Sequence, residues 1–218
     1  MQKIIEFSVL ALDQTNKDVF MQQVETCLKA NIKHIHYDVM DNVFVNNISF
    51  YNLEFLDYLI SKGFIISVHL MVKDVKRFVN TLVTKKINAI TFHCEAIEIG
   101  ESQSVINQIQ KSNLLGGIAI KPHSDLLRYQ SLIKASTKIT LMSVEPGFGG
   151  QKYIINSETR AVQLRSMCKP NTIIEIDGGI NGDTIKLCHH YCDHFVTGSY
   201  LFKDLNQLPI LQKIINPN

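Results

Sequence analysis

Short apolar runs alternate with amphipathic stretches along nearly the whole chain. The amphipathic stretches carry apolar residues at helical spacing; examples are 17–30, 75–86, 102–112 and 181–190. The apolar runs are short enough for single strands and lie near residues 4–10, 32–39, 64–70, 88–93, 115–120, 138–144, 172–177 and 194–198. The pattern therefore predicts eight consecutive strand–helix units.

Repeated strand–helix units are compatible with two architectures, an open doubly wound sheet and a closed barrel. Gly147, Gly149 and Gly150 do not form the GxGxxG pattern and do not follow the first strand, so the dinucleotide-binding fingerprint of the open sheet is missing. Polar groups stand at the ends of several runs, where a barrel gathers its catalytic residues. With no Pro/Gly/Ser-rich linker, we expect residues 1–218 to form a single α/β domain, a (β/α)8 TIM barrel.

The charge pattern argues against large anionic partners. Net charge is +2 with no basic block, which disfavours a nucleic-acid surface or a polybasic membrane patch. No apolar run approaches the roughly 18 residues that span a bilayer, and Glu6 and Asp13 interrupt a segment that would be apolar in a signal peptide. We therefore expect a cytoplasmic protein that binds a small molecule rather than nucleic acid or a membrane.

The cysteines offer a weaker signal. They are five in number and lack a CxxC pair, which does not indicate a disulfide framework. Cys188 and Cys192 have i, i+4 spacing beside His189 and His190, which raises the alternative of a second metal site. The two histidines fall on other faces of the same helix, so we disfavour that alternative.

Four potential metal ligands stand near the ends of three runs. His36 and Asp38 are two residues apart in a strand-like segment and share one face of it, while His69 and Asp177 end two further runs. If these run ends converge, one divalent ion per chain is expected. Two imidazoles with two carboxylates suit zinc or ferrous iron better than magnesium. Manganese or cobalt could take the place of zinc or iron. The plainer alternative is that each aspartate caps a helix and each histidine packs in the core.

Glycine-rich segments follow the sixth, seventh and eighth runs. PGFGG, DGG and TGS would expose backbone N–H groups near one another, which is how barrels build a phosphate site. Plain turn chemistry is the alternative, because glycine is the default residue where φ is positive. The candidate phosphate-site residues are Gly147, Phe148, Gly149, Gly150, Gly178, Gly179, Gly198 and Ser199.

Six segments of the chain, in order, resemble the signature segments of ribulose-phosphate 3-epimerases, which are TIM barrels. They are HYDVMDNVFVNN, SVHLMV, ITFHCEA, VEPGFGGQ, IEIDGGIN and VTGS. The resemblance extends from about Ser8 to Phe202, nearly the whole chain. It implies an isomerase that interconverts D-ribulose 5-phosphate and D-xylulose 5-phosphate in the pentose phosphate pathway.

The resemblance also implies roles for individual residues. Epimerisation next to a ketone removes a proton from one face of a carbon and returns one to the other face, so it needs two acid/base groups. The family's two catalytic aspartates fall on Asp38 and Asp177, and a divalent ion would stabilise the enediolate. The residues that match substrate contacts are Ser8, His69 and Asp177, and those that match an apolar cap over the site are Met40, Met71 and Met142.

The chain departs from the family pattern at several positions. Asn42 stands where Gly is usual, and Asn tolerates the left-handed conformation, so we expect the turn to survive. Ser67 replaces an Asp on the strand face of His69, where a lost carboxylate would weaken the orientation of that ligand. His93 and Glu95 match the pattern and are expected to supply supporting hydrogen bonds. The other departures are Phe7 and Asn46 in place of Pro, and Tyr200 in place of a smaller residue.

Two other functions stay open on the sequence alone. A hexulose-phosphate 3-epimerase, such as one acting on allulose 6-phosphate, would keep the same motifs, because loops set the length of the sugar. A non-catalytic sugar-phosphate-binding paralogue could keep the glycine loops, but it would have little reason to keep both aspartates and both histidines. A homo-oligomer is compatible with the sequence.

Overall fold

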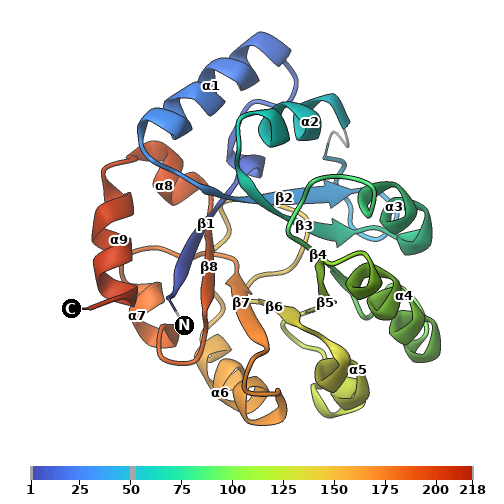
Figure 1. The fold of residues 1–218 in the computed structure, drawn as a ribbon. Helices are drawn as coiled ribbons and strands as arrows, with labels where there is room; N and C mark the ends of the chain where they lie inside the picture. Colours follow the sequence, from blue (N-terminus) through green and yellow to red (C-terminus); the bar gives the residue numbers. More distant parts are fainter. Residues whose placement is uncertain (1, 50–52, 218) are drawn as a thin grey trace.

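Eight strands pair in sequence order and close into a parallel barrel (Figure 1). The computed structural model describes residues 2–49 and 53–217. The strands are β1 (Ile4–Ser8), β2 (His34–Met40), β3 (Ile65–Met71), β4 (Ala89–His93), β5 (Leu115–Ile120), β6 (Lys138–Met142), β7 (Ile173–Asp177) and β8 (His194–Thr197). The predicted (β/α)8 barrel is confirmed, and each strand begins and ends within two residues of the apolar run that predicted it.

Helices surround the barrel (Figure 1). They are α1 (Lys17–Lys29), α2 (Leu53–Ser61), α3 (Val75–Leu82), α4 (Ile99–Lys111), α5 (Gln130–Ala135), α6 (Ser157–Met167), α7 (Thr184–Cys188), α8 (Ser199–Lys203) and α9 (Gln207–Ile215). Local chemistry sets the start of α1, where the Asn16 side chain accepts hydrogen bonds from two backbone N–H groups of the first turn. Among the helices of the described residues, none combines the length and hydropathy that a membrane span requires.

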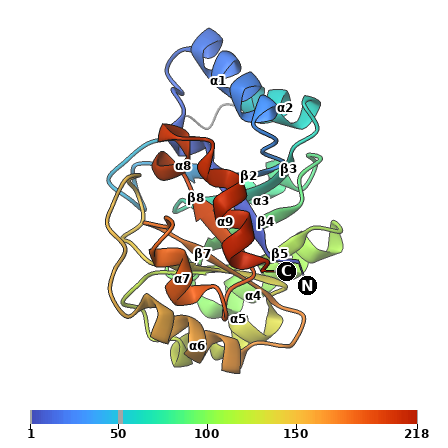
Figure 2. The same ribbon diagram turned by 90° about the vertical axis from the view of Figure 1, so that its left-hand side faces the viewer.

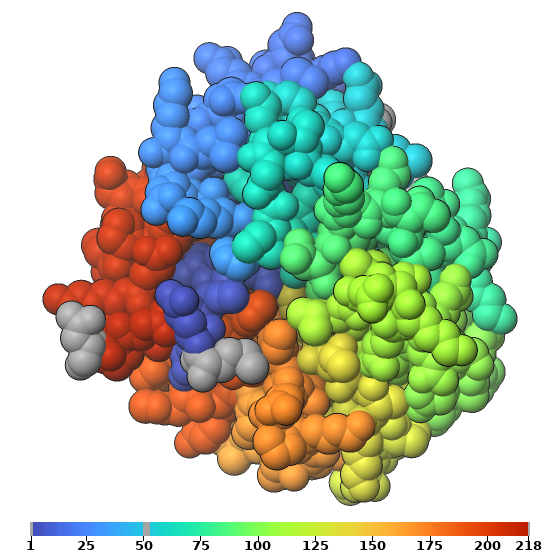
Figure 3. Space-filling view, viewed as in Figure 1, coloured from blue at the N-terminus to red at the C-terminus, as the bar shows by residue number. Residues whose placement is uncertain are grey.

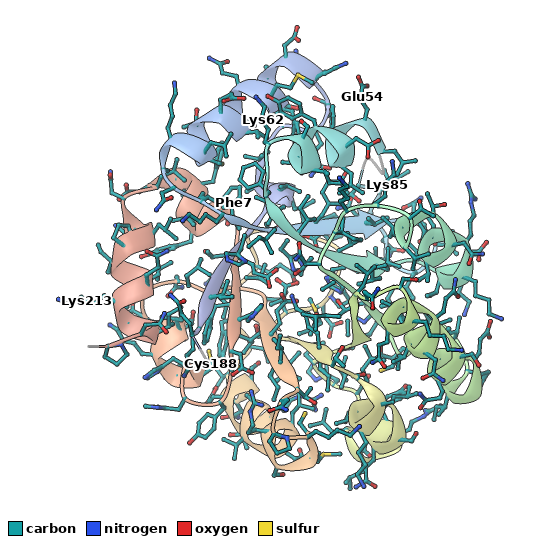
Figure 4. All side chains as sticks on the ribbon, viewed as in Figure 1. Phe7, Glu54, Lys62, Lys85, Cys188 and Lys213 are labelled. Atoms are coloured by element: carbon teal, nitrogen blue, oxygen red, sulfur yellow. The ribbon has the colours of Figure 1, made fainter. Side chains whose placement is uncertain are left out.

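The main apolar core lies between the barrel and the helices. Successive strand residues point to opposite faces of a sheet, and outward-facing side chains such as Val39, Leu70 and Ile176 are fully buried against this layer. In Figure 4, Phe7 and Cys188 lie among the strands and helices, whereas Glu54 and Lys213 extend to the outside. This packing holds the helices onto the barrel and so fixes the strand ends that carry the candidate site.

The interior of the barrel is polar instead. Lys138, the first residue of β6, is fully buried, and its Nζ lies 2.7 Å from Glu6 Oε1, Glu175 Oε2 and Ser67 Oγ. His194 forms a further hydrogen bond with Glu6. Burial alone would lower the pKa of Lys138, but the two carboxylates raise it, so the lysine stays charged. A buried ion-pair network therefore fills the N-terminal part of the barrel.

Lys138→Met is expected to destabilise the fold strongly. The apolar side chain would leave Glu6 and Glu175 without their counter-charge, and removing one member of a buried ion pair costs about 3–5 kcal/mol. Chemical denaturation measures the free energy of unfolding, with Lys134→Met at an exposed position as the matched control. The control should change that free energy by less than about 0.5 kcal/mol. Equal stability of the two variants would contradict the prediction.

Two strands end two residues before their apolar runs do, and serine side chains mark both endings. β1 stops at Ser8, whose Oγ accepts a hydrogen bond from Leu10 N at 3.3 Å and begins a 3-10 turn over Val9–Ala11. β6 stops at Met142, because the next residue turns toward β7 and Ser143 Oγ donates to the Gly178 carbonyl at 2.7 Å. Both serines thus tie a strand end to the loops that surround the candidate site.

The two ends of the chain lie close together. Asn216 accepts a hydrogen bond from Lys3 N at 3.0 Å and donates one to Lys3 O at 2.9 Å, and both termini lie at the same end of the molecule in Figure 2. In the space-filling view the first residues, in blue, lie beside the C-terminal helices, in red (Figure 3). The last helix thereby closes the ring of helices against β1.

Candidate active site

Three strands bring the four predicted metal ligands together at the C-terminal end of the barrel. β2 carries His36 and Asp38, β3 pairs with it so that His69 lies opposite Asp38, and Asp177 ends β7. One ring nitrogen or carboxylate oxygen from each residue lies within 4.8 Å of the other three. Both histidines are fully buried, and Asp177 is only partly exposed. The strand ends therefore converge as the sequence analysis expected.

The spacing of these atoms fits a metal ion. His36 Nε2 and His69 Nδ1 lie 3.3 Å apart, and each is 3.2 Å from Asp38 Oδ1. Asp177 Oδ2 lies 3.6 Å from the same nitrogen of His36 and 3.5 Å from that of His69. Four ligands placed tetrahedrally about 2.0–2.1 Å from a zinc ion are separated by about 3.3–3.4 Å. The donor set thus suits one divalent ion both in its chemistry and in its spacing.

Buried negative charge at this cluster favours a cation. Burial opposes ionisation of Asp38, but the neighbouring His36 and its hydrogen bond hold the pKa of the Asp38 carboxyl well below its usual range. Burial would likewise lower the pKa of His36, yet Asp38 and Glu175 raise it well above its usual value. Ser8 Oγ donates to Asp38 Oδ2 at 2.8 Å, which leaves Oδ1 for the two histidines. The cluster therefore attracts positive charge, whether a proton or a metal ion.

Each of the two histidines directs its second ring nitrogen at a buried neighbour. His36 Nδ1 lies 3.5 Å from Glu175 Oε1, and His69 Nε2 lies 3.1 Å from His93 Nε2. His93 Nδ1 in turn lies 3.2 Å from Glu95 Oε2. Burial lowers the pKa of His93 to about 4, and contact with His93 outweighs burial to lower the pKa of Glu95 to about 2. The supporting hydrogen bonds expected from His93 and Glu95 are therefore confirmed.

A cavity of about 840 Å³ opens over the cluster, large enough for a small-molecule ligand. Asp38 and Asp177 line it, whereas His36 and His69 lie fully buried behind its wall. The substrate contact that the resemblance implies for His69 stays a prediction; its two ring nitrogens face the other candidate ligands and His93. The other predicted residues that line the cavity are Ser8, Met40, Met71, Met142, Gly147, Phe148, Gly149, Gly150, Gly178, Gly179, Gly198 and Ser199.

Methionines form an apolar wall over the cluster. Met40, Met71 and Met142 are each 2% exposed and line the cavity. Met40 and Met71 lie opposite each other on β2 and β3 and pack with Val45 in an apolar cluster separate from the main core. Their uncharged thioether side chains thus form an apolar surface in the cavity that Asp38 and Asp177 also line.

The glycine loops differ in how much room they leave for a side chain. A Cβ at Gly178 would lie 2.4 Å from the nearest side-chain atom, and one at Gly179 would lie 2.4 Å from a backbone nitrogen. Both residues also have positive φ, so the fold itself requires glycine there. At Gly149 and Gly198 the nearest atoms to an added Cβ would be 3.7 and 3.5 Å away, which is ordinary contact. The fold leaves room for a side chain at these two positions.

The chain matches known proteins along most of its length. A family model described as the Ribulose-phosphate 3 epimerase family matches residues 4–202. The chain belongs to this family. Ribulose-phosphate 3-epimerase from Buchnera aphidicola subsp. Baizongia pistaciae is 36% identical over 187 residues, 82% of this chain and 81% of that protein. The protein of the same name from Mycoplasma genitalium is 34% identical over 181 residues, 83% of this chain and 84% of that protein. The expectation of an epimerase, an isomerase acting on carbohydrate phosphates, is confirmed.

Solved structures outside the family share the barrel. A mutant tryptophan synthase alpha-subunit from Pyrococcus furiosus aligns with 98% of this chain and 96% of its own, with a TM-score of 0.68 and 11% identity. A tryptophan synthase chain from Mycobacterium tuberculosis aligns with 98% of this chain and 90% of its own, with a TM-score of 0.68 and 13% identity. At these identities the likeness shows the fold alone.

The departures from the family pattern have clear structural settings. Asn42 has a φ of 57°, which confirms the expected left-handed turn. Ser67 does not orient His69, because its Oγ accepts a hydrogen bond from Lys138 Nζ and the second nitrogen of His69 faces His93. The orientation of His69 therefore depends on His93 rather than on the side chain at position 67. Tyr200 lines the cavity beside the glycine loops, as expected for a residue that narrows it.

Two cationic residues at the cavity were not predicted from the sequence. Lys152 and Lys203 line it together with the glycine loops. Their signal was available, since Lys152 directly follows GFGGQ and Lys203 stands one helical turn after Ser199. Asn47 was also missed; its Nδ2 donates to the Gly147 carbonyl at 2.6 Å and joins the loop after β2 to the loop after β6. An anion in the cavity would meet positive charge as well as backbone N–H groups.

A second grouping of potential ligands is occupied by the chain itself. Glu6, Glu175 and His194 come close enough to hold an ion, but Lys138 Nζ lies 2.7 Å from an oxygen of each glutamate. The ammonium group takes the position that a metal would need. The second metal site raised from the sequence rested on Cys188 and Cys192; both are buried, and neither belongs to the groupings found among the described residues.

Proposed function

We propose that this chain is a metal-dependent ribulose-phosphate 3-epimerase that interconverts D-ribulose 5-phosphate and D-xylulose 5-phosphate in the pentose phosphate pathway. The observation that carries the proposal is that two carboxylates from separate strands, Asp38 and Asp177, line the cavity and lie beside the same pair of buried histidines. Membership of the family and the names of its relatives support the reaction class.

One divalent ion would be held by His36, Asp38, His69 and Asp177. Zinc or ferrous iron fits this mixture of nitrogen and oxygen donors best, with manganese or cobalt as substitutes. When bound, the ion would supply a Lewis acid that polarises the ketone and stabilises the negative charge that develops on its oxygen. The spacing of 3.2–3.6 Å between the histidine nitrogens and from them to the carboxylate oxygens is the structural support for this assignment.

Asp38 and Asp177 would move the proton at the third carbon of the sugar. One carboxylate removes the proton from one face of that carbon, and the other returns a proton to the opposite face. The 2.8 Å hydrogen bond from Ser8 orients the Asp38 carboxylate while it does so. The methionine wall would exclude water and so limit stray protonation of the reacting carbon.

The glycine loops would bind the phosphate end of the substrate. Backbone N–H groups at Gly149 and Gly198 can approach an anion closely because no side chain intervenes. Lys152 and Lys203 line the same cavity and would add charge-assisted contacts. This end of the cavity would hold the phosphate and thereby set the distance of the third carbon from the two carboxylates.

An assay of the metal-loaded protein on D-ribulose 5-phosphate and allulose 6-phosphate tests the proposal. A higher kcat/KM on the pentulose phosphate is the expected result. A higher value on the hexulose phosphate would identify the hexulose-phosphate alternative instead. Binding of both sugars without turnover would identify a non-catalytic binding protein.

Gly149→Ala and Gly198→Ala should raise KM for the phosphorylated sugar while the fold stays intact. Apart from its neighbours in the chain, the added methyl group meets no atom of the described residues closer than 3.5 Å, yet it would stand between the backbone and the phosphate. Losing one hydrogen bond to a charged group costs about 1.5–3 kcal/mol, which corresponds to roughly a ten- to hundredfold rise in KM. Initial rates over a range of substrate concentrations measure the effect, and thermal melting checks the fold.

Gly100→Ala is the matched control for these variants, because Gly100 is exposed and an added Cβ there meets nothing within 4 Å. It should leave KM unchanged.

Free ribulose should be a very poor substrate, because it lacks the phosphate group that the loops hold. Comparable turnover of ribulose and its 5-phosphate would rule out the phosphate site.

A further inference from the structure

His69 is linked to a chain of hydrogen-bonding groups that runs away from the candidate metal centre. Its Nε2 lies 3.1 Å from His93 Nε2, and His93 Nδ1 lies 3.2 Å from Glu95 Oε2. The other oxygen of Glu95 accepts hydrogen bonds from Lys121 N, at 2.9 Å, and from Ser124 Oγ. His69 and His93 are fully buried, so water does not compete for their ring nitrogens.

The order of donors and acceptors along this chain follows from its far end. An ionised carboxylate accepts hydrogen bonds and donates none, so the proton of the His93 ring lies on Nδ1, facing Glu95. His93 Nε2 is then an acceptor, and the hydrogen bond to it must come from His69 Nε2. A proton on Nε2 leaves His69 Nδ1 with a lone pair, and Nδ1 is the atom that faces His36 and Asp38.

We propose that Glu95 and His93 form a positioning pair that keeps the proton of His69 on Nε2 and directs the lone pair of Nδ1 at the ion. The inference deepens the proposed function and rests on its metal centre. Partners that hold the outer nitrogen of a metal-binding histidine fix its tautomer and ring orientation. Neither Glu95 nor His93 needs to touch the ion or the sugar.

Glu95→Gln tests the proton order more sharply than simple removal of the side chain. The backbone N–H of Lys121 requires an acceptor, so the amide oxygen of Gln would take that place and its NH2 group would face His93 Nδ1. A donor at that place moves the His93 proton to Nε2, where it opposes the proton on His69 Nε2. His69 would then favour a proton on Nδ1, which competes with the ion.

Zinc affinity, measured by competition with a chelator, should fall about ten- to hundredfold in Glu95→Gln. Glu95→Ala, which removes the acceptor without adding a donor, should lose less. Glu98→Gln is the matched control, because Glu98 is exposed and makes no capping hydrogen bond at α4; its affinity should equal that of the unaltered protein. If Glu95→Gln binds zinc as tightly as the Glu98→Gln control does, the proposal is overturned.

Ring-nitrogen NMR of histidine-labelled, zinc-loaded protein reads the tautomer directly and does not depend on activity. The unaltered protein should show His93 protonated on Nδ1. A His93 proton on Nε2 in that protein would overturn the positioning pair even if the epimerase activity is present. If the unaltered protein does not bind zinc, the metal centre of the proposed function is wrong. The tautomer of His93 in the metal-free protein would then still show whether the predicted order of donors and acceptors is correct.

Discussion

His36→Ala and His69→Ala are each expected to lose the divalent ion and epimerase activity together. One ring nitrogen of each histidine lies 3.2–3.6 Å from the other three donor atoms of the candidate centre. Alanine at either position would leave three donors in place of four. An ion at such a site contributes several kcal/mol of transition-state stabilisation. Because about 1.4 kcal/mol corresponds to a factor of ten, activity should fall roughly a thousandfold or more.

Elemental analysis of the purified variants, alongside initial rates, measures both losses. His190→Ala is the matched control, since His190 is exposed in the turn after α7, and it should keep both metal and activity. Chelation should inactivate the unaltered protein, and zinc, ferrous iron, manganese or cobalt should restore it. Fully active protein without a stoichiometric metal would refute the metal centre.

The barrel and part of the site could be predicted because they depend on local patterns. Strands packed under helices read as short apolar runs, and the eight runs correspond to the eight strands that close the barrel. The two-residue period of a strand placed His36 and Asp38 on one face, and the structure has both at one centre. The ligand from β3 and the ligand from β7 followed from the rule that strand ends of a barrel converge.

The ion-pair network inside the barrel could not be predicted in the same way. Glu6, Lys138 and Glu175 each stand alone within or beside an apolar run, and nothing in the local pattern indicates a partner. Their contacts exist because closure of the barrel brings the N-terminal parts of β1, β6 and β7 around one point. Ser67 was therefore interpreted only as the loss of a carboxylate beside His69, whereas its hydroxyl contacts Lys138.

The contact between His69 and His93 depends on strand register. His69 lies opposite Thr91 on β4, and His93 is two residues further along the same face. A motif match could identify His93 as part of a pattern without indicating which ring it touches. The side-chain direction and the stagger of β3 and β4 decide that contact, and neither can be read from apolar periodicity.

Asp38→Asn and Asp177→Asn are each expected to abolish epimerisation. An amide cannot carry the proton, so either change leaves one face of the carbon without an acid/base group, and general acid–base catalysis contributes about 10²–10⁴-fold to a rate. Initial rates on both ketose phosphates measure the loss. Asp183→Asn, at a side chain that is 98% exposed six residues after Asp177, is the matched control and should keep full activity.

Metal binding complicates a rate measurement alone, because both aspartates also belong to the candidate centre. Exchange with deuterated solvent separates the two roles when each variant is shown to retain its metal. The remaining carboxylate still faces one side of the substrate, so each variant should exchange the proton of the one ketose phosphate that this carboxylate serves, without converting it into the other. If both metal-loaded variants exchange neither substrate, Asp38 and Asp177 act only as ligands. If either variant epimerises at the rate of the unaltered protein, its aspartate is not one of the two bases, and a different group must carry the proton on that face.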